Sequence, residues 1–299
     1  MGPVSFRAAM AFILTVVARR DATSLSPPRL NHIRNAVRGA PPVILSDGEA
    51  ADIPVGHAPD PSVLAAALEG QPIDAILTKP RGRRKAVLLA DMDSTIVTGE
   101  TLDELAEFAG IGERIAAITR RAMNGELDFK AALRERVAML KGLEVGALEK
   151  TWARVRITSG AKELVATMRA HGALTALISG GFSFFTGRVA DALGFDLHRS
   201  NTLLDDGAVL TGRVAEPILD RDSKLAALHE LARTRGVKLS ATLAVGDGAN
   251  DLDMIRAAGL GVAFHAKPVV AQEARVRVDH ADLRALLFAQ GYPASVFRC

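Results

Sequence analysis

Residues 86–95 read Ala-Val-Leu-Leu-Ala-Asp-Met-Asp-Ser-Thr, and this stretch decides the fold class. An uninterrupted apolar run stops at two carboxylates, Asp91 and Asp93, which are followed by two hydroxyl residues. Such a run is typical of a strand buried on both faces, as in a parallel sheet covered by helices. Because ligands bind at the carboxyl ends of strands in these sheets, we expect both carboxylates to lie at a functional site. Clustered carboxylates suit a hard divalent cation and a covalent aspartyl intermediate, although an Asp-x-Asp pair alone is also common in loops.

Two later apolar runs also end in residues that can carry chemistry. Residues 173–178 lead into Ser179-Gly180-Gly181, and residues 241–245 lead into Gly246-Asp247-Gly248-Ala249-Asn250-Asp251. Between them, a stretch of helical character carries Asp222-Ser223-Lys224. Each segment alone is a weak signal, but the set in this order is a strong one.

This ordered set resembles the motifs of the haloacid dehalogenase superfamily of phosphatases. The resemblance implies an α/β fold with a doubly wound, Rossmann-like parallel sheet and a small helical cap inserted after the first strand. It also implies that Asp91 is the nucleophile and that Asp93 is the general acid and base. Mg²⁺ would be held by the Asp91 side chain, the Asp93 backbone carbonyl and Asp247, while Asp251 orders the waters of the metal.

The same resemblance implies that Ser179, Gly180 and Lys224 surround the phosphoryl oxygens. Glycine lets a backbone N–H approach closely, and lysine supplies a compact positive charge. The structural alternatives are ordinary ones. Asp247 and Asp251 could form a turn and cap a helix, and Lys224 could be a solvated helix residue.

The resemblance is closest to the phosphoserine phosphatase family and extends from about residue 85 to 290. Glu100 stands where that family places the carboxylate that binds the substrate amine, and Arg136 where it places the arginine that binds the substrate carboxylate. Met123 and Phe129 match apolar contacts of the cap, and Asn250 matches a residue beside the phosphate. A zwitterionic substrate needs both a carboxylate and an arginine fork, whereas the alternative for Glu100 and Arg136 is an exposed helix charge.

The resemblance therefore implies an enzyme, a magnesium-dependent phosphatase that converts O-phospho-L-serine and water to L-serine and phosphate through an aspartyl-phosphate. This is the last step of serine biosynthesis. One alternative is a related phosphatase or phosphotransferase on another small phosphomonoester, and the presence of Glu100 and Arg136 argues against it. Another is a non-catalytic amino-acid sensor, against which the presence of Asp91 and Lys224 argues.

The segment before the motifs predicts a second domain. Residues 11–79 show a strand-helix-strand-strand-helix-strand pattern that resembles a ferredoxin-like α+β unit of the ACT type. We expect this domain over residues 1–80, with residues 1–9 as an extension, and the phosphatase domain over 81–299, with its cap at about 98–158. The loop at residues 20–24 lacks the glycine usual in ACT ligand sites, so packing or dimerisation is the alternative to effector binding. We interpret the basic cluster at residues 79–85 as a solvated interdomain linker, the alternative being a phosphate or partner site.

Composition limits the remaining possibilities. The chain has 299 residues, of which 48% are hydrophobic, enough for a large domain and a smaller one. A net charge of +3 without a long basic face predicts no nucleic-acid partner. The apolar run at residues 10–18 is too short to span a membrane, and Cys299 as the only cysteine fits a reducing cytoplasm. The expected partner is a small-molecule substrate, and a homodimer is left open.

Overall fold

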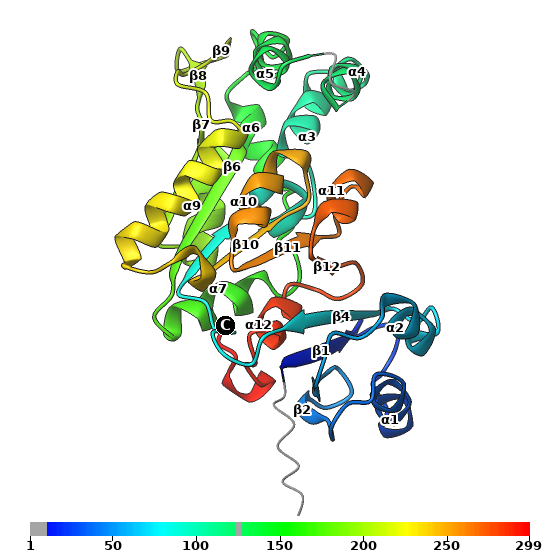
Figure 1. Ribbon diagram of the computed structural model, residues 1–299. Helices are drawn as coiled ribbons and strands as arrows, with labels where there is room; N and C mark the ends of the chain where they lie inside the picture. The colour runs from blue at the N-terminus through cyan, green and yellow to red at the C-terminus, as the bar shows by residue number, and fades with distance from the viewer. Residues whose placement is uncertain (1–10, 124–126) are drawn as a thin grey trace, which may run out of the picture.

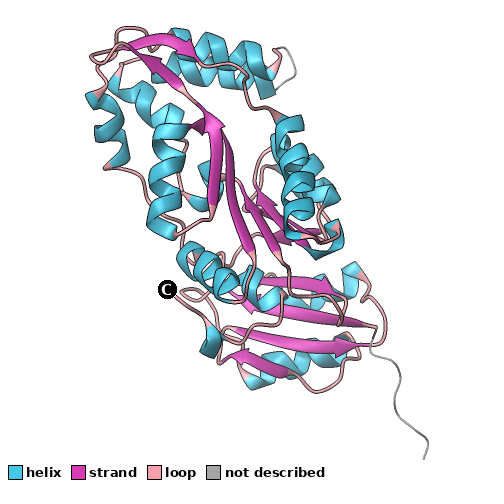
Figure 2. Cartoon of the chain, turned by 90° about the vertical axis from the view of Figure 1, so that its left-hand side faces the viewer, coloured by secondary structure: helices cyan, strands magenta, loops and turns pink. Residues whose placement is uncertain are grey.

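The computed structural model describes residues 11–123 and 127–299, so the extension expected at residues 1–9 lies outside the described chain. Figure 1 shows a central sheet with helices on both sides, a helical layer at one end and a second sheet at the other. The view in Figure 2 shows these tiers stacked along the long axis of the molecule. Among the described residues, no helix has the length and apolar content to cross a membrane.

The central sheet has six parallel strands in the order β12–β11–β10–β5–β6–β7, so the expected doubly wound fold is confirmed. Its strands are β5 (Val87–Ala90), β6 (Leu174–Phe182), β7 (Leu197–Asn201), β10 (Thr242–Gly246), β11 (Leu260–Phe264) and β12 (Val276–Val278). All four residues of β5 are fully buried, as the apolar run predicted. β6 continues through the Ser179-Gly180-Gly181 motif, four residues beyond the expected strand end.

Helices cover both faces of this sheet. Leu88 and Ala90 of β5 belong to a core shared with α7 (Ala161–Ala170), α8 (Ser183–Leu193) and α12 (Ala285–Ala289). Val87 and Leu89 belong to the opposite core, with α9 (Arg221–Arg235), α10 (Leu252–Ala257) and α11 (Pro268–Glu273). Burying an aliphatic side chain contributes about 1.5–3 kcal/mol, so a strand with a core on each face is held in place from both sides.

The chain between β5 and α7 forms the helical layer. It contains α3 (Thr101–Phe108), α4 (Gly112–Met123), α5 (Phe129–Ala138) and α6 (Gly146–Trp152), which confirms a helical cap inserted after the first strand of this sheet. The two connections to the core run side by side, because the Thr98 N–H donates to the Arg156 carbonyl at 2.9 Å and the Thr158 N–H to the Ile96 carbonyl at 2.9 Å. The cap is therefore joined to the core by a paired stem.

A β-hairpin of the core also contacts the cap. It consists of β8 (Leu203–Asp205) and β9 (Leu210–Val214), and β9 packs against α5. Backbone hydrogen bonds of 2.8–2.9 Å join residues 142–145 of the cap to residues 208–210 of the hairpin. The cap is consequently fixed to the core at two separate places.

The N-terminal sheet is antiparallel, in the order β2–β3–β1–β4. Its elements are β1 (Phe12–Ala18), α1 (Pro27–Ala36), β2 (Val43–Ser46), β3 (Ala50–Val55), α2 (Pro61–Leu68) and β4 (Ile73–Thr78). The expected ferredoxin-like pattern is therefore confirmed. Asp60 caps α2, since its side chain accepts a hydrogen bond from the Ser62 N–H at 2.8 Å.

The interpretation of residues 79–85 as a solvated linker is wrong for Arg83. Its guanidinium donates to both Asp52 oxygens of β3 at 2.6 and 2.9 Å and to the Phe288 carbonyl at 3.2 Å. The Arg83 side chain is only 11% exposed. A charge-rich sequence does not reveal this, because the partners of Arg83 lie far away along the chain.

A second polar contact joins the two sheets. The buried Asp74 of β4 accepts hydrogen bonds of 2.7–3.1 Å from three consecutive backbone N–H groups, at Asp279, His280 and Ala281. A carboxylate that accepts several N–H bonds satisfies donors that would otherwise be buried without partners. The N-terminal sheet is thus docked through buried charges as well as apolar side chains.

Candidate active site

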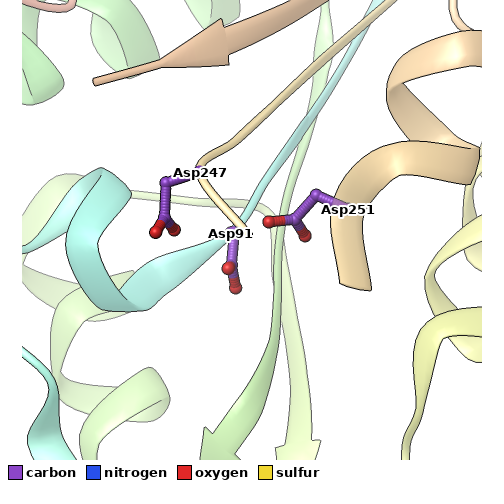
Figure 3. A group of neighbouring side chains, drawn as sticks. All are labelled: Asp91, Asp247 and Asp251. Atoms are coloured by element: carbon purple, nitrogen blue, oxygen red, sulfur yellow. The ribbon is translucent and has the colours of Figure 1, made fainter. Parts of the chain in front are cut away.

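The motif residues meet at one edge of the central sheet. β5 pairs in parallel with β10 and with β6, so the ends of these strands lie next to one another. Asp91 follows β5, Asp247 follows β10, and Asp251 lies a short turn further on. One oxygen from each of these carboxylates lies within 4.8 Å of the others, as the grouped side chains in Figure 3 illustrate.

Burial makes this acidic cluster electrostatically costly. Asp91, Asp247 and Asp251 are all 5% exposed or less. Loss of hydration, reinforced by the nearby Asp91 charge, raises the pKa of Asp247 to about 6 and also raises the pKa of Asp251. A divalent cation would offset this repulsion, and carboxylate oxygens are the donors that hard cations prefer. The residues present therefore fit a metal ion.

Lys224 lies against this cluster. Its Nζ is 2.8 Å from Asp91 Oδ1 and 2.6 Å from Asp251 Oδ1. Burial alone would lower the pKa of Lys224, but the two carboxylates outweigh it and the pKa is raised, so the amine stays charged. Asp251 also accepts from the Gly248 N–H at 3.1 Å. Both Asp251 oxygens thus already bind protein donors, an arrangement that suits indirect contact with a metal.

Asp93 occupies a different environment. One of its oxygens accepts from the Thr101 N–H at 2.9 Å, and the other lies 3.4 Å from the Ser179 hydroxyl, which donates to it. Burial, together with the charge of Glu100, raises the pKa of Asp93 to about 7. A carboxyl with a pKa near neutrality can both give and accept a proton under ordinary conditions. Asp91 and Asp93 are therefore set apart by their surroundings.

Residues 179–181, an irregular part of β6 that we call the Ser179 loop, require glycine at positions 180 and 181. A Cβ on Gly181 would lie 2.7 Å from Asp93 Oδ2, and a Cβ on Gly180 would lie 3.2 Å from the ring of Phe129. Without these side chains, the Gly181 N–H donates to Ser179 Oγ at 2.9 Å. The loop thereby contacts both Asp93 and the cap helix α5.

The cap and the segment after β11 also contribute charged side chains to the site, in addition to the strand-end carboxylates and Lys224. Arg136 of α5 is partly buried, which lowers its pKa, while the charges of Asp103 and Glu100 act in the opposite direction. Glu100 Oε1 accepts from the Ser94 hydroxyl at 2.8 Å. Lys267 Nζ lies 3.8 Å from Glu100 Oε1 and 3.6 Å from Asp247 Oδ2. Glu100 and Arg136 are 36 positions apart in the sequence, yet they are close enough in the structure for the Glu100 charge to act on the pKa of Arg136.

The two remaining residues expected at the site are Asn250 and Met123. Asn250 lies in the turn after β10, where its Oδ1 closely approaches Gly248, on the same turn as Asp247 and Asp251. Met123 ends helix α4, but its side chain lies outside the described part of the structure.

Sequence reasoning assigned no role to Lys267 or Thr101, and it quoted Thr95 within the first motif without giving it one. Thr95 donates to Asp247 Oδ1 at 3.4 Å, and the Thr101 N–H binds Asp93. A signal for Lys267 was available, because it follows the apolar strand Leu260–Phe264. The rule that ligands bind at carboxyl ends of parallel strands applies to that strand as well.

Comparison with known proteins agrees with this geometry. Residues 88–256 match the family model described as haloacid dehalogenase-like hydrolase. A solved structure of a HAD family hydrolase from Salmonella enterica serovar Typhi superposes with a TM-score of 0.84 at 28% identity, covering 94% of this chain and 98% of that one. The chain therefore belongs to the haloacid dehalogenase-like hydrolases.

Within that family, the chain groups with the phosphoserine phosphatases. It is 47% identical to the phosphoserine phosphatase of Streptococcus thermophilus over 67% of this chain and 93% of that protein. It is 44% identical to the Archaeoglobus fulgidus phosphoserine phosphatase, of which it covers only 62%, less than two thirds. A solved substrate-bound phosphoserine phosphatase complex superposes with a TM-score of 0.65 at 38% identity, over 69% of this chain and 98% of that one.

Proposed function

We propose that this protein is a magnesium-dependent phosphatase that hydrolyses O-phospho-L-serine to L-serine and phosphate. The observation that carries the proposal is the pairing of two unlike carboxylates. Asp91 lies beside the Lys224 ammonium and the acidic cluster, while Asp93, whose pKa is raised to about 7, lies beside Ser179. One carboxylate is thereby suited to nucleophilic attack and the other to proton transfer.

The proposed reaction has two steps. Asp91 attacks the phosphorus atom and forms an aspartyl-phosphate, while the protonated Asp93 gives its proton to the departing serine alkoxide. Asp93 then removes a proton from the water that attacks the aspartyl-phosphate, which releases phosphate and restores Asp91. Lys224, Ser179 and the Gly180 N–H would stabilise the phosphoryl oxygens.

A magnesium ion held by Asp91, the Asp93 backbone carbonyl and Asp247 would neutralise phosphoryl charge. Asp251 would act on the metal through water, because Lys224 and the Gly248 N–H already bind its oxygens. The family membership and the acidic cluster support a metal ion, and we propose that it is Mg²⁺.

Substrate choice is assigned to the cap side of the site. Glu100 would bind the ammonium of phosphoserine, and Arg136 would bind its carboxylate. Ser94 and Lys267 contact Glu100, while Glu100 and Asp103 partly offset the effect of burial on Arg136. Phe129, which contacts Gly180, and Met123 would supply apolar contacts, and Asn250 would lie beside the phosphate.

The direct test measures phosphate release from a panel of phosphomonoesters with and without magnesium. Phosphoserine should be the preferred substrate, and metal removal should silence the reaction. Arg136→Ala should reduce the preference for phosphoserine over phosphoethanolamine by about 10–100-fold, because the latter lacks the carboxylate.

Arg134→Ala is the matched control. Arg134 lies on the same helix but binds Glu216 outside the site, at 2.7 Å, so its loss should leave the preference unchanged. An unaltered ratio of kcat/KM values in Arg136→Ala would refute the assignment of Arg136. A preference for another phosphomonoester in the wild type would refute phosphoserine as the substrate.

We further propose that the reaction ends serine biosynthesis in the cytoplasm. The lone exposed Cys299 suits a reducing compartment. The N-terminal sheet is proposed as a packing unit, with formation of a homodimer and binding of an amino-acid effector as alternatives.

A further inference from the structure

Asn201, at the end of β7, is a buried residue whose side chain makes two hydrogen bonds next to the Ser179 loop. Its side chain donates through Nδ2 to the Gly180 carbonyl at 2.8 Å and accepts through Oδ1 from the Leu219 N–H at 2.8 Å. The residue is 2% exposed. The opposite amide orientation would set acceptor against acceptor and donor against donor, so the two partners fix the orientation of the carboxamide.

The position of Asn201 follows from an irregularity in the sheet. β6 and β7 are in register at Ile178 and Arg199 and again at Phe182 and Asn201, so four steps on β6 oppose two steps on β7. The backbone ladder is therefore interrupted across Ser179-Gly180-Gly181. The Asn201 side chain provides the Gly180 carbonyl with a hydrogen-bond partner at this interruption.

The bond to Gly180 also determines how Ser179 is oriented. The Gly180 carbonyl and the Gly181 N–H belong to one planar peptide group, so fixing one fixes the other. The Gly181 N–H donates to Ser179 Oγ at 2.9 Å and uses one of its lone pairs. The single hydroxyl proton of Ser179 is then directed elsewhere, and it donates toward Asp93 Oδ2 at 3.4 Å.

We propose that Asn201 is a positioning residue for the phosphatase reaction. By fixing the Gly180–Gly181 peptide, it keeps one Ser179 lone pair bound to the Gly181 N–H and directs the hydroxyl proton to the side of Asp93, where the phosphoryl group would bind. It also ties the Ser179 loop to Leu219, five residues before Lys224, so that the two groups that stabilise the phosphoryl oxygens keep their spacing. This inference rests on the function proposed above.

A double-mutant cycle with Ser179 tests the inference, with phosphoserine as substrate. Asn201→Asp keeps the acceptor for Leu219 but replaces the donor to Gly180 with an oxygen, and Asn201→Ala removes both bonds without adding a charge. Loss of this one bond should lower kcat by about 10-fold while KM changes less than about 3-fold. In a Ser179→Ala background the same substitutions should cause little further loss, because Asn201 acts through Ser179.

Gln290→Glu is the matched control. Gln290 is also a buried amide (1% exposed), and it accepts from the Lys85 N–H and donates to the Leu286 carbonyl, each at 2.9 Å. Lys85 precedes β5, whereas Asp91 follows it, so this network lies at the opposite end of the strand. Gln290→Glu should lower the melting temperature and leave kcat within about 2-fold of the wild type.

The outcomes separate the two claims. If Ser179→Ala lowers kcat but both Asn201 variants retain it and only melt earlier, Asn201 is structural and the inference fails. Full additivity of the Asn201 and Ser179 effects would overturn it as well. If the wild type does not hydrolyse phosphoserine, the proposed function itself fails. If it does but Ser179→Ala has no effect on kcat, the inference fails, because Asn201 is proposed to act through Ser179. The kcat comparison is made with whichever Asn201 variant has the melting temperature closer to that of the wild type, so that loss of folding is not mistaken for loss of positioning.

Discussion

Asp247→Asn should stabilise the metal-free protein at pH 8, although it removes a residue of the proposed metal site. Burial and the Asp91 charge raise the pKa of Asp247 from 3.8 to about 6. The native state therefore binds this proton more tightly than the unfolded state does. Stability from this group is present at low pH and is lost as the pH rises from about 4 through about 6.

The size of the effect follows from the shift in pKa. A rise from 3.8 to about 6 is about two units, and each unit corresponds to about 1.4 kcal/mol, so the ionised carboxylate costs about 3 kcal/mol at pH 8. The amide is nearly the same shape and carries no charge. This figure is the upper limit of the gain in unfolding free energy, because Asp247→Asn also weakens the contacts of the carboxylate with Lys267 and Thr95.

Urea denaturation in EDTA, followed by circular dichroism at pH 5 and pH 8, measures the effect. The gain from Asp247→Asn should be roughly half as large at pH 5. Asp253→Asn is the control with the opposite sign, because hydrogen bonding to Arg221 lowers the pKa of Asp253. An Asp247→Asn variant no more stable than the wild type at pH 8 in EDTA would refute the electrostatic reasoning.

Three further predictions concern the reaction. Asp91→Asn should abolish turnover with an unchanged circular dichroism spectrum, because the amide keeps the shape but cannot attack phosphorus; activity within a few-fold of the wild type would exclude Asp91 as nucleophile. EDTA should silence the enzyme, Mg²⁺ should restore it and Ca²⁺ should substitute poorly because of its larger and looser coordination shell; full activity after exhaustive chelation would contradict the metal scheme. A truncation that begins near Arg83 should keep the metal-dependent reaction, because the site lies after residue 90. Serine should inhibit the truncated and the full-length protein with the same inhibition constant. An additional non-competitive component of serine inhibition in the full chain alone would identify the N-terminal sheet as a sensor.

The elements that carry the motifs were predictable from local sequence. Fully apolar runs such as residues 87–90 are typical of strands in a sheet covered on both faces, and the strand-end rule then places Asp91 and Asp247 together. The resemblance carried by the motifs implied the helical cap after the first strand, which the structure contains.

The contacts that depend on tertiary structure were not predictable in this way. Arg83 belongs to a basic cluster typical of an exposed linker, and only the docked N-terminal sheet brings Asp52 to it. Asn201 becomes informative only once the register interruption between β6 and β7 is known. Local sequence carries no information about partners that are distant along the chain.

The docking of the N-terminal sheet has a consequence for how the molecule unfolds. Arg83 bridges Asp52 and the Phe288 carbonyl, and Asp74 binds the amides of residues 279–281, only while both sheets are folded and in contact. Unfolding either sheet therefore breaks polar contacts that the other sheet makes across the junction. Local opening of either sheet is therefore coupled to the other, and the two should exchange their core amide hydrogens as one cooperative unit.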